Sequence, residues 1–315
     1  MSHKKRFFIL ISLVIISFLL YLLYGLNPVS YRFALSRRIP NALAIVVTGS
    51  AIAVSTMIFQ TITNNRILTP SILGLDSLYI MIQTLIIFIF GSSTLGVIGT
   101  EANYLLSCLL MVIFSTILFK FMFNENQNLV FLLMVGMILG TLFSSISSFL
   151  QMIIDPNEFL LVQNQMFASF TNVKDSLLRI SVVTSVLALI WSYKELKQLD
   201  VLALGREHAI NLGVDYGKVV RKLLIVVSIL ISASTALVGP VTFLGLLITN
   251  LAHQLFKDYR HNILIPATIL LGIIALVAGQ FIVERVLGFG TSIGVVINFV
   301  GGIYFIYILL KEDHL

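Results

Sequence analysis

Histidine and cysteine side chains are the groups in this 315-residue chain that could most readily ligate a metal or act as nucleophiles. The five histidines are His3, His208, His253, His261 and His314. They show no metal-ligand spacing, and the sequence contains neither an HExxH pair nor a GxSxG nucleophile turn. We interpret each histidine as an interfacial polar residue and Cys108, which lies in an apolar run, as a packing residue. We therefore expect no catalytic residue, no metal site and no cofactor.

A glycine motif comes closest to a nucleotide site. Gly213-Val-Asp-Tyr-Gly217-Lys218 resembles a phosphate-binding loop, but it is one residue short between the glycines. Val219 stands where Ser or Thr would hold magnesium. The chain cannot bind ATP by this means, so if it pumps, the energy must come from another polypeptide.

The composition excludes a soluble domain. Hydrophobic residues make up 58% of the chain and charged residues 11%, whereas soluble domains carry about 25% charged residues. Such a chain cannot bury its apolar surface in its own core, so we expect membrane lipid around it. Backbone amides in lipid must bond within their own segment, which favours helices. The net charge of +6 is typical of basic cytoplasmic loops, and we expect no nucleic acid as a partner.

Charges, prolines and glycines divide the sequence into ten candidate membrane-spanning helices. They cover about residues 7–24, 41–61, 72–90, 102–123, 129–150, 177–193, 221–238, 243–256, 263–283 and 293–310. We expect an all-α polytopic membrane protein with a single transmembrane domain over residues 1–315. With the N-terminus inside, 14 of the 20 Lys and Arg residues fall on the cytoplasmic side. This bias predicts that both termini are cytoplasmic.

Ion-coupled carriers usually place an ionisable side chain near the middle of the membrane. Asp76, Glu101, Lys120 and Arg285 all fall at or near the ends of the expected spans. Their placement weakens the interpretation as an ion-coupled secondary transporter, which remains the alternative. A membrane-embedded enzyme would need a charged or metal-binding cluster within the bilayer, and the sequence shows none.

The most informative polar connection covers about residues 198–213. Asp200 is a candidate N-cap, and Gly205 and Gly213 are each placed to end a short helix in the left-handed conformation. The pattern predicts two short helices joined by a glycine hinge. Either they lie on the membrane surface as a solvated loop, or they dock into a groove of a soluble partner.

Four motifs, in order along most of the chain, resemble those of the type II ABC importer permeases, which transport iron–siderophore complexes, heme and vitamin B12. The sequence LALGREHAINLGVD, residues 202–215, is similar to the coupling helices of that family. The other three motifs are Arg38-Ile39-Pro40, the stretch from Asn65 through Thr69-Pro70-Ser-Ile-Leu-Gly74, and Gly239-Pro240-Val-Thr-Phe-Leu-Gly245-Leu246. The family fold has ten helices in each subunit. This sequence looks closest to the iron–siderophore branch, with heme or cobalamin as alternative cargoes.

The resemblance implies the partners and the site residues. The partners are a second permease subunit, identical or paralogous, two cytoplasmic ATPases and an extracellular substrate-binding protein, at a bacterial cell membrane. ATPase coupling falls on Leu204, Gly205, Arg206, Glu207, His208, Ala209, Leu212 and Gly213. Docking of the binding protein falls on Arg38 and Arg285. Pro70, Gly74, Gly239, Pro240 and Gly245 belong to turns beside the translocation path.

The sequence departs from the family pattern at several places. Asn41 stands where a second signature Arg is usual, Arg66 where a Pro is usual, and Thr242 where a Gly is usual. Thr249-Asn250 replaces a Pro-His pair, and Ser292 replaces a late Pro. These departures affect local turns and indicate a divergent branch.

Overall fold

The computed structural model describes residues 2–26, 31–122, 129–171 and 173–312, and every regular element within them is a helix. The ten main helices are α1 (His3–Leu23), α2 (Tyr31–Thr63), α3 (Leu75–Ile98), α4 (Thr100–Met122), α5 (Leu129–Ile153), α7 (Asp175–Trp191), α11 (Tyr216–Val238), α12 (Leu244–Phe256), α13 (His261–Arg285) and α14 (Ile293–Glu312). Shorter helices are η1 (Pro70–Leu73), α6 (Pro156–Gln165), α8 (Tyr193–Leu196), α9 (Leu199–Leu202) and α10 (Arg206–Asn211). The all-α prediction is confirmed, and each expected span coincides with one main helix. His314 lies outside the described residues.

Helix length and composition identify the membrane-crossing elements. Among the described residues, six helices are long and apolar enough to cross a bilayer: α1, α2, α4, α5, α11 and α13. Shorter apolar helices cover Leu75–Gly91, Leu244–Phe256 and Ile293–Tyr307. The chain is therefore a multi-pass membrane protein.

The second helix starts earlier than the sequence predicts. We expected a span from about residue 41, with Arg38-Ile39-Pro40 ahead of it, but α2 begins at Tyr31 and contains Pro40. The added turns hold themselves together locally, because the Ser36 hydroxyl donates to the Phe33 carbonyl. The Arg37 guanidinium also lies 5.1 Å from the Phe33 ring centre. Polar residues thus extend the N-terminal end of α2 beyond its apolar part. The position at which the hydropathy falls therefore does not mark the start of the helix.

Helices α2 and α11 form the centre of the bundle and pack against each other, with α13 beside α2. Small residues allow the close approach. A Cβ on Gly49 of α2 would lie 3.3 Å from the carbonyl carbon of Gly272 in α13. In lipid no hydrophobic driving force brings helices together. Van der Waals contact between closely approaching backbones is therefore a main source of helix packing in a membrane.

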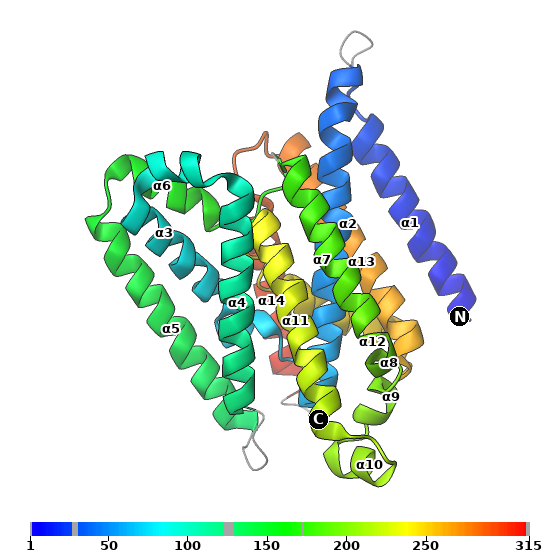
Figure 1. Ribbon diagram of the computed structural model, residues 1–315. Helices are drawn as coiled ribbons and strands as arrows, with labels where there is room; N and C mark the ends of the chain where they lie inside the picture. Colours follow the sequence, from blue (N-terminus) through cyan, green and yellow to red (C-terminus); the bar gives the residue numbers. More distant parts are fainter. Residues whose placement is uncertain (1, 27–30, 123–128, 172, 313–315) are drawn as a thin grey trace.

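A glycine pair on α5, Gly136 and Gly140, also packs closely. A Cβ on Gly136 would lie 2.7 Å from a side-chain carbon of Leu73, and one on Gly74 would lie 2.7 Å from the Cα of Gly140. This contact fixes η1 and the start of α3 against α5. Figure 1 shows α3, α4, α5 and α6 as one group at the left and α1 at the opposite edge. Helices α8, α9 and α10 lie together at the lower end of the bundle, whereas α6 and the start of α2 lie at the upper end.

Candidate functional site

The polar connection between α7 and α11 forms three short helices, and α9 and α10 are separated at Gly205. This agrees with the two helices and glycine hinge that the sequence predicts between Leu199 and Gly213. The role expected for Asp200 is wrong. Gln198 is the N-cap of α9, and Asp200 lies inside that helix. Its carboxylate instead contacts α13, because the fold brings the first residue of α13 beside it.

Gly205 and Gly213 both adopt backbone conformations that other residues resist. Gly205 has φ 92° and ψ 166° and precedes α10, in a region occupied almost only by glycine. Gly213 has φ 85°. Its N–H donates to the Ile210 carbonyl, and the Val214 N–H donates to the Ala209 carbonyl. These two bonds form a Schellman motif, which ends α10 and reverses the chain towards α11.

The segment from Leu204 to Leu212, which contains α10, exposes apolar side chains. Helix α10 lies at the lower tip of the bundle in Figure 1. Leu204 is 56% exposed and Leu212 is 64% exposed, and Ile210 is also exposed. Ala209, by contrast, is completely buried. Arg206, Glu207 and His208 are exposed on the same helix. The tip therefore combines apolar and charged side chains on a surface fixed to the bundle through Ala209.

A charged contact holds α8 against α11. Lys222 Nζ lies 2.8 Å from Glu195 Oε1 and 5.0 Å from the centre of the Trp191 ring. Burial acts to raise the pKa of Glu195, but the hydrogen bond and the charge of Lys222 outweigh it, so the pKa lies below its usual value. Glu195 is therefore ionised at neutral pH, and its contact with Lys222 fixes the start of the connection.

The two turn motifs expected beside the translocation path meet inside the bundle. Pro70 is the first residue of η1, and Gly74 ends this helix with φ 84°. In the second turn Gly239 has φ 97°, and a Cβ there would lie 3.1 Å from the Phe167 carbonyl oxygen. The buried Pro240 follows directly.

A partly buried hydrogen bond joins the two turns, since the Thr242 hydroxyl donates to Asp76 Oδ2 at 2.7 Å. The departure at Thr242 therefore has a structural reason. Gly245, at the start of α12, packs against Thr56 of α2, and a Cβ would lie 2.2 Å from the Thr56 hydroxyl oxygen. Gly74 and Gly239 thus lie against the backbone of a neighbouring segment and Gly245 against a neighbouring side chain, whereas Pro70 and Pro240 are buried beside them. Asp76 was expected only as a span-end residue.

The two arginines assigned to docking both contact the end of α1. Arg38 Nη1 donates to the carbonyls of Tyr21, Leu22 and Tyr24, at 3.3, 2.7 and 3.0 Å. Arg285 Nη2 donates to the Tyr24 carbonyl at 3.1 Å. They therefore satisfy carbonyls that have no partner within α1. Arg285 and the neighbouring Arg37 are exposed, and Arg38 is half-buried.

Sequence reasoning missed a buried histidine. His261 is 5% exposed, so its interpretation as an interfacial polar residue is wrong. Its ring lies between Asp200 of α9 and Thr61 of α2. The charged stretch Asp258-Tyr-Arg260-His261 marks the start of α13 in the sequence, but nothing local indicates that Asp200 is its partner.

An apolar bundle of ten main helices in the described residues, with an exposed tip of apolar and charged side chains at one end and closely packed turns inside, defines a multi-pass membrane protein. The FecCD transport family model matches residues 6–311, and the chain belongs to this family. This agrees with the resemblance drawn from the four motifs, and it confirms that the chain is a transporter component and not an enzyme.

Individual relatives extend the comparison. The petrobactin import system permease protein YclO of Bacillus subtilis (strain 168) is 54% identical over 99% of this chain and 99% of its own length. The petrobactin import system permease protein FatC of Bacillus anthracis is 33% identical, covering 98% of this chain and 90% of FatC. A solved structure described as an inward-facing metal-chelate type ABC transporter has a TM-score of 0.85 at 24% identity, covering 98% and 100% of the two chains. That structure shows that the fold is shared.

Proposed function

We propose that this chain is the membrane-spanning permease subunit of an ABC importer for an iron–siderophore complex, with petrobactin as the first candidate cargo. The observation that carries the proposal is the 54% identity to a petrobactin import permease along almost the whole of both chains. The chain forms a single transmembrane domain over residues 1–315. It needs no metal ligands of its own for this task, because an intact chelate already supplies them.

ATP hydrolysed by a separate subunit supplies the energy in this proposal. The tip formed by Leu204 to Gly213 enters a groove on a cytoplasmic ATPase, in the way that short amphipathic helices bind grooves. The exposed Leu204, Ile210 and Leu212 supply the apolar contacts. Closure of two ATPase subunits on ATP then moves the bundle between outward- and inward-open states as a rigid-body change.

The orientation follows from this assignment. The end of the bundle that carries α10 faces the cytoplasm, as do both termini, in agreement with the bias of Lys and Arg towards that side. A second permease subunit, identical or paralogous, completes the path through the bacterial cell membrane. The opposite end receives an extracellular binding protein, with Arg38 and Arg285 as the docking residues and the exposed Arg37 beside them.

Uptake into proteoliposomes tests the proposal. The permease is reconstituted with its second permease, the ATPase and the binding protein, and ferric petrobactin, heme and cobalamin are offered separately. We expect ATP-dependent uptake of ferric petrobactin that continues after ion gradients are dissipated. Uptake that persists with a catalytically inactive ATPase and stops when the ion gradient is removed would establish the secondary transporter instead. Uptake of cobalamin or heme in place of ferric petrobactin would change the cargo and keep the mechanism.

A further inference from the structure

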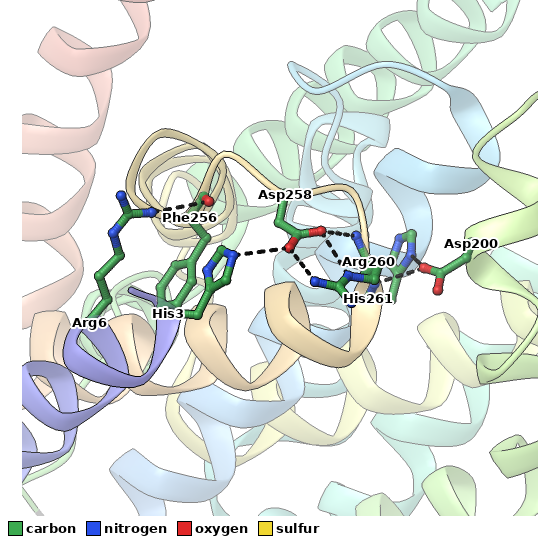
Figure 2. A network of polar contacts seen from close by, with 7 residues as sticks. All are labelled: His3, Arg6, Asp200, Phe256, Asp258, Arg260 and His261. Atoms are coloured by element: carbon green, nitrogen blue, oxygen red, sulfur yellow. Dashed lines mark hydrogen bonds and ion pairs between the residues drawn. The ribbon is translucent and has the colours of Figure 1, made fainter. Parts of the chain in front are cut away.

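A network of polar contacts joins four helices at the α10 end of the bundle (Figure 2). Asp258, between α12 and α13, accepts hydrogen bonds from the backbone N–H and the guanidinium of Arg260. His3 Nε2 lies 3.4 Å from Asp258 Oδ2, and Arg6 Nη1 donates to the Phe256 carbonyl at 3.2 Å. These contacts fasten the start of α1 to the corner between α12 and α13.

The next residue of that corner, His261, connects the corner to the segment that carries α10. Asp200 Oδ1 accepts from the backbone N–H of His261 at 2.8 Å and lies 2.6 Å from its ring Nδ1. Because a carboxylate can only accept, Nδ1 carries the proton in this pair. Asp200 therefore caps α13 from another helix, and its negative charge lies at the positive end of the α13 dipole.

The other ring nitrogen of His261 continues the connection to α2. His261 Nε2 lies 2.7 Å from the Thr61 hydroxyl, which is itself 2.8 Å from the Met57 carbonyl. Thr61 and the His261 ring are buried, whereas 35% of the Asp200 side chain is exposed. Three side chains thus run from the edge of α9, through the N-terminus of α13, into the C-terminal turn of α2.

Helix α9 can pass on a displacement of α10 because the face of α9 that carries Leu199 and Leu202 is packed against the bundle. Leu199 is completely buried and Leu202 is 2% exposed, so α9 is packed into the bundle instead of lying loosely on it. Helix α10 follows after Gly205, and a Cβ at that position would meet nothing within 4 Å. Helix α10 contacts both α9 and α11, so a push on α10 reaches the bundle through α9 as well as through α11. Asp200 is the charged side chain by which α9 contacts α13.

We propose that Asp200, His261 and Thr61 are positioning residues that transmit movement of the α9–α10 segment to α13 and α2. The inference rests on the proposed function, because it assigns a route for the motion that the ATPase is proposed to drive. Helices α2 and α13 touch through Gly49 and Gly272, so a shift at their ends moves them together. Loss of the link leaves the ATPase bound and active but separates hydrolysis from movement of the path.

Transport measured per ATP hydrolysed distinguishes this role from simple stabilisation. The reconstituted complex is compared with Asp200→Ala, Asp200→Asn and Thr61→Val, with ferric petrobactin uptake and phosphate release measured on the same vesicles. Couplings between sites typically change equilibria by about fivefold or more. We expect Asp200→Ala to lower uptake per ATP by at least about fivefold while hydrolysis continues, and Asp200→Asn, which keeps an acceptor oxygen, to restore part of it.

Asp155→Ala is the matched control. Asp155 also accepts from a backbone N–H at the start of a helix, that of Asn157 in α6, but it is exposed, it contacts its own helix, and α6 lies at the end of the bundle away from α10. Its variant should keep the wild-type uptake per ATP. An Asp200→Ala variant that also keeps the wild-type ratio, or lowers uptake and hydrolysis in equal proportion, overturns the inference.

Thr61→Val cuts the far end of the link without changing α9, and it decides the question if Asp200→Ala does not fold. A lowered ratio in this variant supports transmission, and an unchanged ratio refutes it. The wild-type measurement separates the two levels of the argument. Wild-type uptake without ATP dependence refutes the proposed function, whereas ATP-driven wild-type uptake with unchanged variant ratios refutes only the link.

Discussion

Replacement of Gly213 by valine tests whether the end of α10 must keep its shape for transport. The residue has φ 85°, and a Cβ there would meet nothing within 4 Å. Valine therefore has room, and its cost comes from the backbone alone. A left-handed conformation costs an L-residue about 1–2 kcal/mol, and β-branching makes that conformation still less favourable.

A penalty of this size changes the population of the native α10 end by a factor of about 5–30. The Schellman bonds of Gly213 and Val214 are the ones that weaken, so α10 changes direction relative to α11 while the bundle stays folded. We expect Gly213→Val to reduce ATP-driven ferric siderophore uptake about 5–30-fold, with the thermal unfolding midpoint of the purified permease close to that of the wild type.

Two control variants isolate the backbone as the cause. Gly213→Asn adds a side chain of similar volume, but asparagine tolerates the left-handed region, so most uptake should remain. Gly217→Ala lies in the first turn of α11, again with nothing within 4 Å of its Cβ, and alanine suits a helix better than glycine. It should transport as the wild type does. Wild-type uptake by Gly213→Val, or equal damage from Val and Asn, would refute the reasoning.

Three further predictions concern other parts of the chain. Gly245→Ala forces a Cβ to 2.2 Å from the Thr56 hydroxyl, so it should destabilise the permease by about 1–3 kcal/mol, and Thr56→Ala in the same chain should recover part of the unfolding midpoint. Arg38→Glu should weaken binding-protein affinity, more strongly at low salt, where charges are less screened; an affinity that does not change at any ionic strength removes the docking role. Hydrogen bonds from Arg260 lower the pKa of Asp258 from 3.8 to about 2 in the folded protein. A carboxyl with such a lowered pKa stabilises the folded state at every pH above its pKa in the unfolded chain. Asp258→Asn should thus be less stable than the wild type at neutral pH, with the difference closing only as the pH falls from 3.8 to about 2; closure near neutral pH contradicts this.

The number and order of the main helices could be predicted because the bilayer imposes one rule on every segment. An apolar run must be helical and long enough to cross, whatever its neighbours are. The rule does not reach beyond the lipid, and the start of α2 shows this. Tyr31 to Pro40 contains three arginines among apolar and aromatic residues, and local contacts such as that of Arg37 with Phe33 hold it helical.

In the candidate site, too, local backbone features could be predicted from the sequence, whereas contacts between distant residues could not. Gly205 and Gly213 could be predicted because a positive φ is a local property that the residue type reveals. The partners of the buried polar groups could not. Asp200 and His261 are 61 positions apart, and Asp76 and Thr242 are 166 apart. Asp200 resembled an N-cap for its own helix, and only the packing of α9 beside α13 transfers that capping role to another helix.

The glycines divide into two groups, and the division argues for a rigid bundle moved from one end. A Cβ on Gly74, Gly239 or Gly245, which lie at turns inside the bundle, would come within 3.1 Å or less of a neighbouring residue. A Cβ on Gly205 or Gly213, at the ends of α10, would meet nothing within 4 Å. Interior turns packed this tightly cannot change their backbone without repacking their neighbours, whereas the α10 hinges are free of such neighbours. A force applied at α10 is therefore taken up first by rotation at its two glycines and then, where α9 is fastened to α13, by movement of the packed helices as one body.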